Sequence, residues 1–189
     1  MHIVGIAGSL RSGSYNAALL RAARELQPES IRIADIAAVP LYNADLEHSA
    51  FPEAVIALQA QLRAADGLLL VSPEYNNSVP GVLKNAVDWL SRPSPKYRDV
   101  FAGKPVGLLG ASTGGFGTTL AQTAWLPVLR TLRGRLWTDK RLLLSHAAAL
   151  FDDRGQLTDG EARKRLAGYL DGFLGYCAEV KRQAAQTGT

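Results

Sequence analysis

Near the start of the chain, the apolar run Ile3-Val4-Gly5-Ile6-Ala7 is followed by the polar residues Gly8-Ser9-Leu10-Arg11-Ser12-Gly13-Ser14-Tyr15-Asn16. The apolar run is typical of a strand that is covered on both faces. Leu19, Ala22, Ala23 and Leu26 then follow the spacing of a buried helix stripe. The polar stretch is therefore predicted to be a turn from a strand into a helix.

The chemistry of this turn suits a phosphate group. Gly8 and Gly13 allow the backbone to adopt positive φ and to come close to a ligand. Arg11 offers a rigid fork of donors, and the helix that follows adds unpaired N–H groups and the positive end of its dipole. The alternative is an ordinary polar loop that only caps a helix.

Three features that this turn lacks indicate which kind of phosphate group it would bind. The turn has no Gly-Lys-Ser/Thr ending, so no lysine is placed for a γ-phosphate, and it is not the Gly-x-Gly-x-x-Gly of dinucleotide sites. It also has no cysteine, which argues against a thiolate phosphatase. A terminal monophosphate that is held and not cleaved fits best.

Length and composition indicate one soluble α/β domain over residues 1–189, with 47% hydrophobic and 20% charged residues. No apolar run reaches the roughly 20 residues of a membrane span, and no signal peptide is evident. The single cysteine, Cys177, excludes an internal disulfide and favours the cytoplasm. The net charge is +4, with a local basic excess over 130–141. We interpret it as a solvated face and expect no nucleic-acid partner.

Strand and helix patterns alternate along the chain, which predicts a parallel sheet wound on both faces. Five strands favour the order 2-1-3-4-5. The expected strands are His2–Ala7, Ile31–Ile36, Gly67–Ser72, Pro105–Ala111 and one within Arg135–Leu144. The expected helices are Ser14–Leu26, a second that begins at Ser49 and Pro52, a third from Pro80 to Leu90, and then Thr118–Leu132 and Thr158–Ala184. Ala37–Ala50, Arg92–Ala102 and His146–Asp159 are expected as connections, and Pro127 is expected to kink or break its helix.

Polar loops follow the first, third and fourth expected strands, and in such a sheet all three lie at one edge. The second loop, Pro73-Glu74-Tyr75-Asn76, suits a flat ring with polar edges: Tyr75 can flank the ring, and the N–H groups of 74–76 can donate to it. Gly114 and Gly115 allow close approach at the other edge. The alternatives are that Tyr75 covers a core edge and that the Glu74 carboxylate is merely solvated.

No side-chain constellation for acid–base, nucleophilic or metal catalysis is evident. His2, His48 and His146 do not pair by spacing with a serine or with the cysteine, and no His/Cys cluster has zinc spacing. We therefore expect no catalytic side chain and no metal.

Three motifs in order carry a resemblance to a known family. They are Gly-Ser-Leu-Arg-x-x-Ser-Tyr-Asn at 8–16, Ser-Pro-Glu-Tyr-Asn at 72–76 and Val-Pro-Gly-x-Leu-Lys-Asn-Ala-x-Asp-Trp-Leu-Ser-Arg-Pro at 79–93. Together they resemble the NADPH-dependent FMN reductase family, which includes azoreductases, quinone reductases and chromate reductases. The resemblance implies a flavodoxin-like fold, non-covalent FMN, and hydride transfer from NADPH or NADH to FMN and then to a small acceptor such as a quinone or azo compound.

The resemblance also implies which residues contact FMN. Those for the phosphate are Ser9, Arg11, Ser14, Tyr15 and Asn16. Those for the flavin ring are Pro73, Glu74, Tyr75 and Asn76, with Ser112, Thr113 and Gly114 at the far edge. Family members are homodimers or homotetramers, which makes Trp89, Tyr97 and Trp125 candidates for an interface, with core burial as the alternative. Arg92 is a candidate for the substrate mouth, or else an arginine that meets a helix dipole.

Two alternatives to an enzyme remain from the sequence: a flavodoxin-like electron carrier and a flavin-binding protein without turnover. Arg11 and the positive net charge favour the enzyme. Leu120 and Leu126 stand where chromate- and quinone-reducing members carry arginines, a departure that argues against chromate and other small anions as acceptors and leaves quinones open.

Overall fold

The computed structural model describes residues 1–93 and 97–187, and its centre is a parallel sheet. The strands are β1 (Ile3–Ala7), β2 (Ile31–Ala34), β3 (Gly67–Val71), β4 (Pro105–Ala111), β5 (Arg135–Leu136) and β6 (Leu142–Leu144). They are arranged in the order β2-β1-β3-β4-β5, and β6 also pairs with β4. Every strand pair is parallel. The predicted doubly wound sheet and its order are confirmed.

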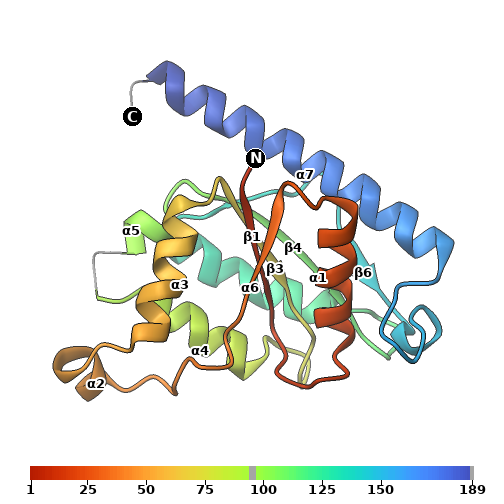
Figure 1. Ribbon diagram of the computed structural model, residues 1–189, viewed down its shortest axis with the longest axis horizontal. Helices are drawn as coiled ribbons and strands as arrows, with labels where there is room; N and C mark the ends of the chain where they lie inside the picture. Colours follow the sequence, from red (N-terminus) through yellow and green to blue (C-terminus); the bar gives the residue numbers. More distant parts are fainter. Residues whose placement is uncertain (94–96, 188–189) are drawn as a thin grey trace.

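The helices alternate with the strands along the chain. They are α1 (Tyr15–Leu26), α2 (Ala44–Ser49), α3 (Glu53–Ala64), α4 (Gly81–Leu90), α5 (Tyr97–Val100), α6 (Thr119–Thr131) and α7 (Gly160–Thr187), with a short 3-10 helix, η1, at Ala147–Ala149. α1 and α7 lie on one side of the sheet, and α3 and α4 on the other (Figure 1). Within the described residues, no helix combines the length and the apolar character that crossing a membrane requires.

Each face of the sheet has its own core. One core joins α1 and α7 to the sheet through Leu19, Leu166 and Phe173. The other joins α3, α4 and α6 through Leu62, Val87 and Trp125. Because β3 and β4 contribute to both cores, all of their residues are buried. This explains why their sequences are almost entirely apolar.

The fifth position of the sheet is filled by two short strands and not by one. β5 pairs with Pro105 and Val106, and β6 pairs with the other end of β4, at Leu109–Ala111. The N–H of Trp137 still donates to the carbonyl of Val106 at 2.9 Å, and residues 138–141 then leave the ladder. Trp137 turns its ring onto Tyr169 of α7, with ring centroids 4.9 Å apart, and the polar residues 138–141 follow. Burial of this ring and solvation of the charges together explain the interruption.

Two predicted connections contain helices. α2 lies within the expected loop Ala37–Ala50, where Asn43 caps it by accepting a hydrogen bond from the N–H of Asp45 at 2.9 Å. α5 lies within the expected connection Arg92–Ala102; residues 94–96 of that connection lie outside the described residues. Asparagine is a favoured helix cap as well as a common loop residue, so Asn43 alone does not distinguish the two.

Of the two outcomes expected for Pro127, a kink or a break of its helix, the break is wrong, because α6 continues to Thr131. Proline removes one N–H and therefore one hydrogen bond to the carbonyl four residues earlier, here that of Thr123. Both Pro127 and Thr123 are exposed. Water can therefore replace the lost bond on this side of the helix.

The tryptophans proposed as interface residues belong to the core. Trp89 and Trp125 have no exposed surface in the single chain. Trp89 is fixed by a hydrogen bond of 2.9 Å from its Nε1 to the carbonyl of Pro40. The side chain of Tyr97 lies outside the part of the chain that the structure describes. For the two tryptophans, the core alternative is confirmed.

Two glycines of α7 offer a matched test of helix packing. A Cβ at Gly172 would lie 2.7 Å from Cζ2 of Trp137, whereas a Cβ at Gly175 would meet nothing within 4 Å. We expect Gly175→Ala to raise the free energy of unfolding by about 1 kcal/mol, because alanine favours the helix. Gly172→Ala should lower it by about 1–3 kcal/mol, because the Trp137 ring is held in place. Urea denaturation measures both; equal shifts would contradict the packing described.

Cys177 is predicted to be unreactive in the folded chain. Its side chain is fully buried, and burial raises the pKa of its thiol to about 12. Because the thiolate is the reactive form, Ellman's reagent at pH 8 should detect no thiol in the native protein and one per chain in denaturant. Rapid labelling of the native protein would contradict the burial of Cys177.

Candidate functional site

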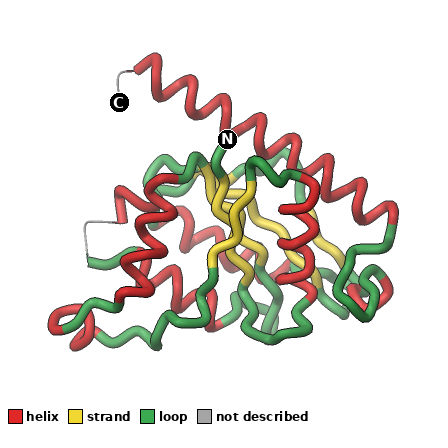
Figure 2. Tube along the Cα trace, viewed as in Figure 1, coloured by secondary structure: helices red, strands yellow, loops and turns green. Residues whose placement is uncertain are grey.

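The loops that leave β1, β3 and β4 meet at one edge of the sheet, as the strand order requires. Figure 2 shows them among the loops along the lower edge of the molecule. They enclose a cavity of about 140 Å³, whose lining includes ten of the twelve predicted site residues. The lining consists of Ser9, Arg11, Ser14, Tyr15, Asn16, Pro73, Glu74, Tyr75, Ala111, Ser112 and Thr113. Asn76 and Gly114 adjoin the lining in sequence but do not belong to it.

The β1–α1 loop presents the start of a helix to this cavity. Ser14 is the N-cap of α1, and its Oγ accepts a hydrogen bond from the N–H of Ala17 at 3.2 Å. The N–H groups of the first turn, at Tyr15 and Asn16, have no carbonyl within the helix to bond. The guanidinium of Arg11 lies over the ring of Tyr15, 5.7 Å from its centroid. A cation and free N–H groups therefore meet at the same end of the cavity.

The glycines of this loop do not use the conformational freedom that glycine offers. Positive φ occurs at Gly103, Gly117 and Gly155, and not at Gly8 or Gly13. A side chain would not fit at Gly8, because a Cβ there would lie 2.9 Å from side-chain atoms of both Leu83 and Pro73. The glycine thus lets the first loop pack against the second loop and α4.

Asn16 joins the first loop to the third. Its Nδ2 donates to the carbonyl of Ala111 at 2.8 Å, and its Oδ1 accepts from the N–H of Ala111 at 2.9 Å. The side chain is 4% exposed. The amide therefore holds the start of α1 at the end of β4. Neither this pairing nor the place of Ala111 in the cavity lining was predicted, because the partner is a main-chain group 95 residues away.

The β3–α4 loop contains a tight turn. Tyr75 and Ser78 exchange backbone hydrogen bonds of 3.1 and 3.0 Å, and Asn76 and Asn77 have φ of 50° and 60°. Because the N–H of Tyr75 is used in this turn, it is not one of the predicted donors to a ring. In the described residues, the backbone N–H groups of Glu74 and Asn76 have no partner.

The side chain of Tyr75 lies across the cavity and not on a core edge. Its hydroxyl donates to Oγ of Ser9 at 3.1 Å, which joins the second loop to the first. The residue is 46% exposed. The alternative in which Tyr75 covers the core is therefore wrong, and nearly half of the residue's surface stays exposed beside the cavity.

The carboxylate of Glu74 is not simply solvated. Its Oε2 accepts hydrogen bonds from the N–H groups of Leu120 at 2.8 Å and Ala121 at 3.0 Å, at the start of α6. Glu74 thus joins the second loop to the helix that follows the third loop. Nothing in the local sequence signals this contact.

The β4–α6 loop is anchored to the neighbouring strand β6 and to η1. The N–H of Ser112 donates to the carbonyl of Leu144 at 2.9 Å, and the N–H of Ala147 donates to the carbonyl of Ser112 at 3.0 Å. Oγ of Ser112 accepts from the N–H of Gly114 at 3.2 Å. A Cβ at Gly114 or Gly115 would have no neighbour closer than 3.7 Å. Space for a ligand is therefore available at this edge.

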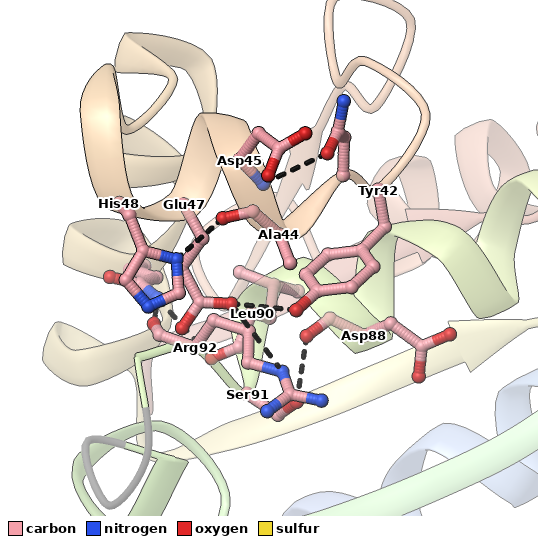
Figure 3. Close-up of polar contacts among 11 residues, drawn as sticks. Tyr42, Ala44, Asp45, Glu47, His48, Asp88, Leu90, Ser91 and Arg92 are labelled. Atoms are coloured by element: carbon pink, nitrogen blue, oxygen red, sulfur yellow. Dashed lines mark hydrogen bonds and ion pairs between the residues drawn. The ribbon is translucent and has the colours of Figure 1, made fainter.

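Arg92 lies in a separate polar cluster between α2 and the end of α4 (Figure 3). Its guanidinium lies over the ring of Tyr42, 5.3 Å from the centroid, and its Nε lies 3.9 Å from Oε2 of Glu47. The same oxygen accepts a hydrogen bond of 2.7 Å from the Tyr42 hydroxyl, which raises the pKa of Tyr42. Arg92 does not line the three-loop cavity, so its role at the substrate mouth stays a prediction.

Other cavities are larger. One of about 260 Å³ and one of about 440 Å³ adjoin the fifth-strand edge, share Lys140 and Arg141, and are lined by none of the three loops. One of about 320 Å³ has residues of the β1–α1 loop in its lining, from Ser12 to Tyr15. In the part of the chain that the structure describes, no three His, Cys, Asp or Glu side chains are grouped to hold a metal ion.

Comparisons with known proteins agree with this site. A family model described as NADPH-dependent FMN reductase matches residues 1–149. An NAD(P)H-dependent FMN reductase from Pseudomonas aeruginosa is 48% identical over 164 residues, which are 86% of this chain and 87% of that protein. A 2-hydroxy-1,4-benzoquinone reductase from Burkholderia sp is 38% identical over 178 residues, covering 93% of this chain and 96% of that protein.

Among solved structures, FerB, a flavoenzyme NAD(P)H:(acceptor) oxidoreductase from Paracoccus denitrificans, matches with a TM-score of 0.84 and 30% identity. The match covers 94% of this chain and 97% of that one. The sheet order, the three-loop site and these relatives lead to one conclusion. The chain belongs to the NADPH-dependent FMN reductase family.

Proposed function

We propose that the protein is an NAD(P)H-dependent FMN oxidoreductase that passes electrons from NADPH or NADH, through bound FMN, to a small-molecule acceptor. One observation carries the proposal. A cavity at the carboxyl edge of the sheet has Arg11 and the start of α1 at one end and the loops of 73–75 and 112–113 around the remainder. In this fold, ligands bind at that edge.

The donors at the first loop fit the phosphate of FMN. A phosphate dianion there would meet the guanidinium of Arg11, the hydroxyls of Ser9 and Ser14, and the first N–H groups of α1. The hydroxyl of Ser14 accepts from Ala17 through its oxygen, so its hydrogen stays available to donate.

The second and third loops fit the ring. The unpartnered N–H groups of Glu74 and Asn76 would donate to polar atoms at the ring edge, and the exposed part of Tyr75 would flank its plane. Ser112, Thr113 and Gly114 would form the far edge. FMN would supply the two-electron redox chemistry, and the protein would bind, orient and tune it.

The acceptor side of the site favours neutral molecules. Leu120 is 45% exposed at the start of α6, and the segment from Ser112 to Leu129 contains no charged residue. A small oxyanion would find no cation on this segment. We infer that neutral aromatic acceptors, such as the quinone named for the Burkholderia relative or an azo compound, are preferred.

Anaerobic mixing with NADPH tests the function. The purified protein with FMN bound should lose its flavin absorbance within seconds under argon, and a quinone should restore it. An electron carrier would bleach only at a slow background rate. A non-catalytic flavin protein would either fail to bleach or bleach without passing electrons to any acceptor.

The assembly and the compartment are also inferences. We infer a homodimer or homotetramer from the family, and a cytoplasmic location from the presence of a single cysteine, Cys177, that is free and buried. Sedimentation of the full-length chain tests the first inference, and cell fractionation tests the second.

A further inference from the structure

α6 begins without a side-chain cap from its own segment. Thr118 is the N-cap residue, yet its side chain makes no hydrogen bond to the first turn. Its Oγ1 instead accepts from Nε2 of Gln122 at 3.2 Å. The first N–H groups of a helix need an acceptor from elsewhere when the cap residue does not supply one.

Glu74 supplies that acceptor from another loop. One carboxylate oxygen accepts from Leu120 at 2.8 Å and from Ala121 at 3.0 Å, across 46 and 47 residues of sequence. A carboxylate at this place also meets the positive end of the helix dipole, and hydrogen bonds to a charged acceptor are stronger than neutral ones. The contact therefore holds two separate elements together.

The position of Glu74 gives this contact a consequence for the cavity. Glu74 belongs to one wall, with Pro73 and Tyr75, whereas α6 follows directly from the opposite wall, which contains Ser112 and Thr113. A second bond between these elements lies deeper, where Nε1 of Trp125 donates to Oγ of Ser72 at 2.9 Å. The two bonds fix the separation of the walls at the base and at the side.

We propose that Glu74 is a positioning residue, whose carboxylate sets the spacing between the second and third loops and thereby the fit of the flavin ring, without contacting the flavin. The proposal rests on the proposed function, because it concerns the same site. It adds that the side chain of Glu74 acts through α6 while its backbone faces the ligand.

Amide exchange in the FMN-free chain tests the cap, and FMN titration tests its consequence. In Glu74→Ala, the amides of Leu120 and Ala121 should exchange roughly tenfold faster, and the dissociation constant for FMN should rise by a similar factor, the scale of a lost helix cap. Glu74→Gln keeps an acceptor oxygen without the charge, so both effects should be smaller.

Asp159→Ala is a matched control, because the Asp159 carboxylate caps α7 through the N–H of Ala162 at 2.7 Å and does not line the cavity. It should destabilise the fold by a similar amount and leave FMN affinity unchanged. The proposal is overturned if Glu74→Ala weakens FMN without faster exchange at 120–121, if exchange changes without loss of affinity, or if the control weakens FMN equally. Failure of the wild-type chain to bind FMN would instead refute the proposed function itself, and with it any role of Glu74 toward a flavin.

Discussion

Arg11→Ala is expected to weaken FMN binding by about 1.5–3 kcal/mol, the scale of a hydrogen bond to a charged group, which corresponds to a roughly 10- to 150-fold higher dissociation constant. The guanidinium lies at the end of the cavity that the β1–α1 loop forms, over the ring of Tyr15, and has no carboxylate partner among the described residues. The loss should therefore come from the ligand and not from the fold. Fluorescence quenching of FMN measures it directly.

Two further variants sharpen this result. Arg11→Lys keeps the charge and loses the planar fork, so its affinity should lie between those of the wild type and the alanine variant. Arg24→Ala removes an exposed arginine from the last turn of the same helix, at the end away from the cavity, and should leave FMN binding unchanged. If Arg11→Ala holds FMN as tightly as the wild type does, the assignment of the phosphate is wrong.

Gly110→Ala should have the largest effect on stability. A Cβ at Gly110 would lie 2.2 Å from the carbonyl oxygen of Ser72 and 2.7 Å from Oγ1 of Thr118. Ser72 cannot easily retreat, because its N–H donates to the carbonyl of Leu109 at 2.9 Å and its Oγ accepts from Trp125. We expect a loss of about 3 kcal/mol or more, at the upper end of overpacking effects.

Urea denaturation measures this loss as a lower midpoint at an unchanged slope. Gly81→Ala is the control, because Gly81 is the first residue of α4 and a Cβ there would meet nothing within 4 Å. Its stability should equal or slightly exceed that of the wild type. A Gly110→Ala protein with wild-type stability would show that the β3 and β4 loops are not packed as described.

The sheet could be predicted from sequence because its signals are local. Buried parallel strands such as Leu68–Val71 are continuous apolar runs, and helices between them show a stripe of buried residues. Once strands and helices alternate, the fold class fixes the order, and the order places the three loops at one edge. The site followed from topology and from the polar composition of those loops.

What could not be predicted depends on main-chain partners far along the chain. The amide of Asn16 pairs with Ala111 across 95 residues, a contact that no local pattern predicts. The carboxylate of Glu74 likewise caps a helix whose own N-cap side chain makes no hydrogen bond to the first turn. The tertiary structure decides which backbone N–H and C=O groups lack a local partner. A local sequence pattern therefore cannot predict where such a side chain will bond.

The interruption of the fifth strand has a similar origin. The segment 135–144 has the apolar ends of a strand, and its charged middle could have been a solvated face. The ring of Trp137 packs against Tyr169 and Phe173 at the point where the pairing of β5 with β4 ends. That packing depends on where α7 crosses the sheet, which residues 135–144 do not encode.

Parallel titrations of the flavin-free chain with FMN and with riboflavin test the central claim most directly, because the two ligands differ only in the phosphate. If the β1–α1 loop binds the phosphate, FMN should bind one per chain and riboflavin should bind at least roughly a hundredfold more weakly, given several charge-assisted hydrogen bonds. Equal affinities for the two flavins, or no binding of FMN, would contradict the claim that the three loops form a site for this mononucleotide.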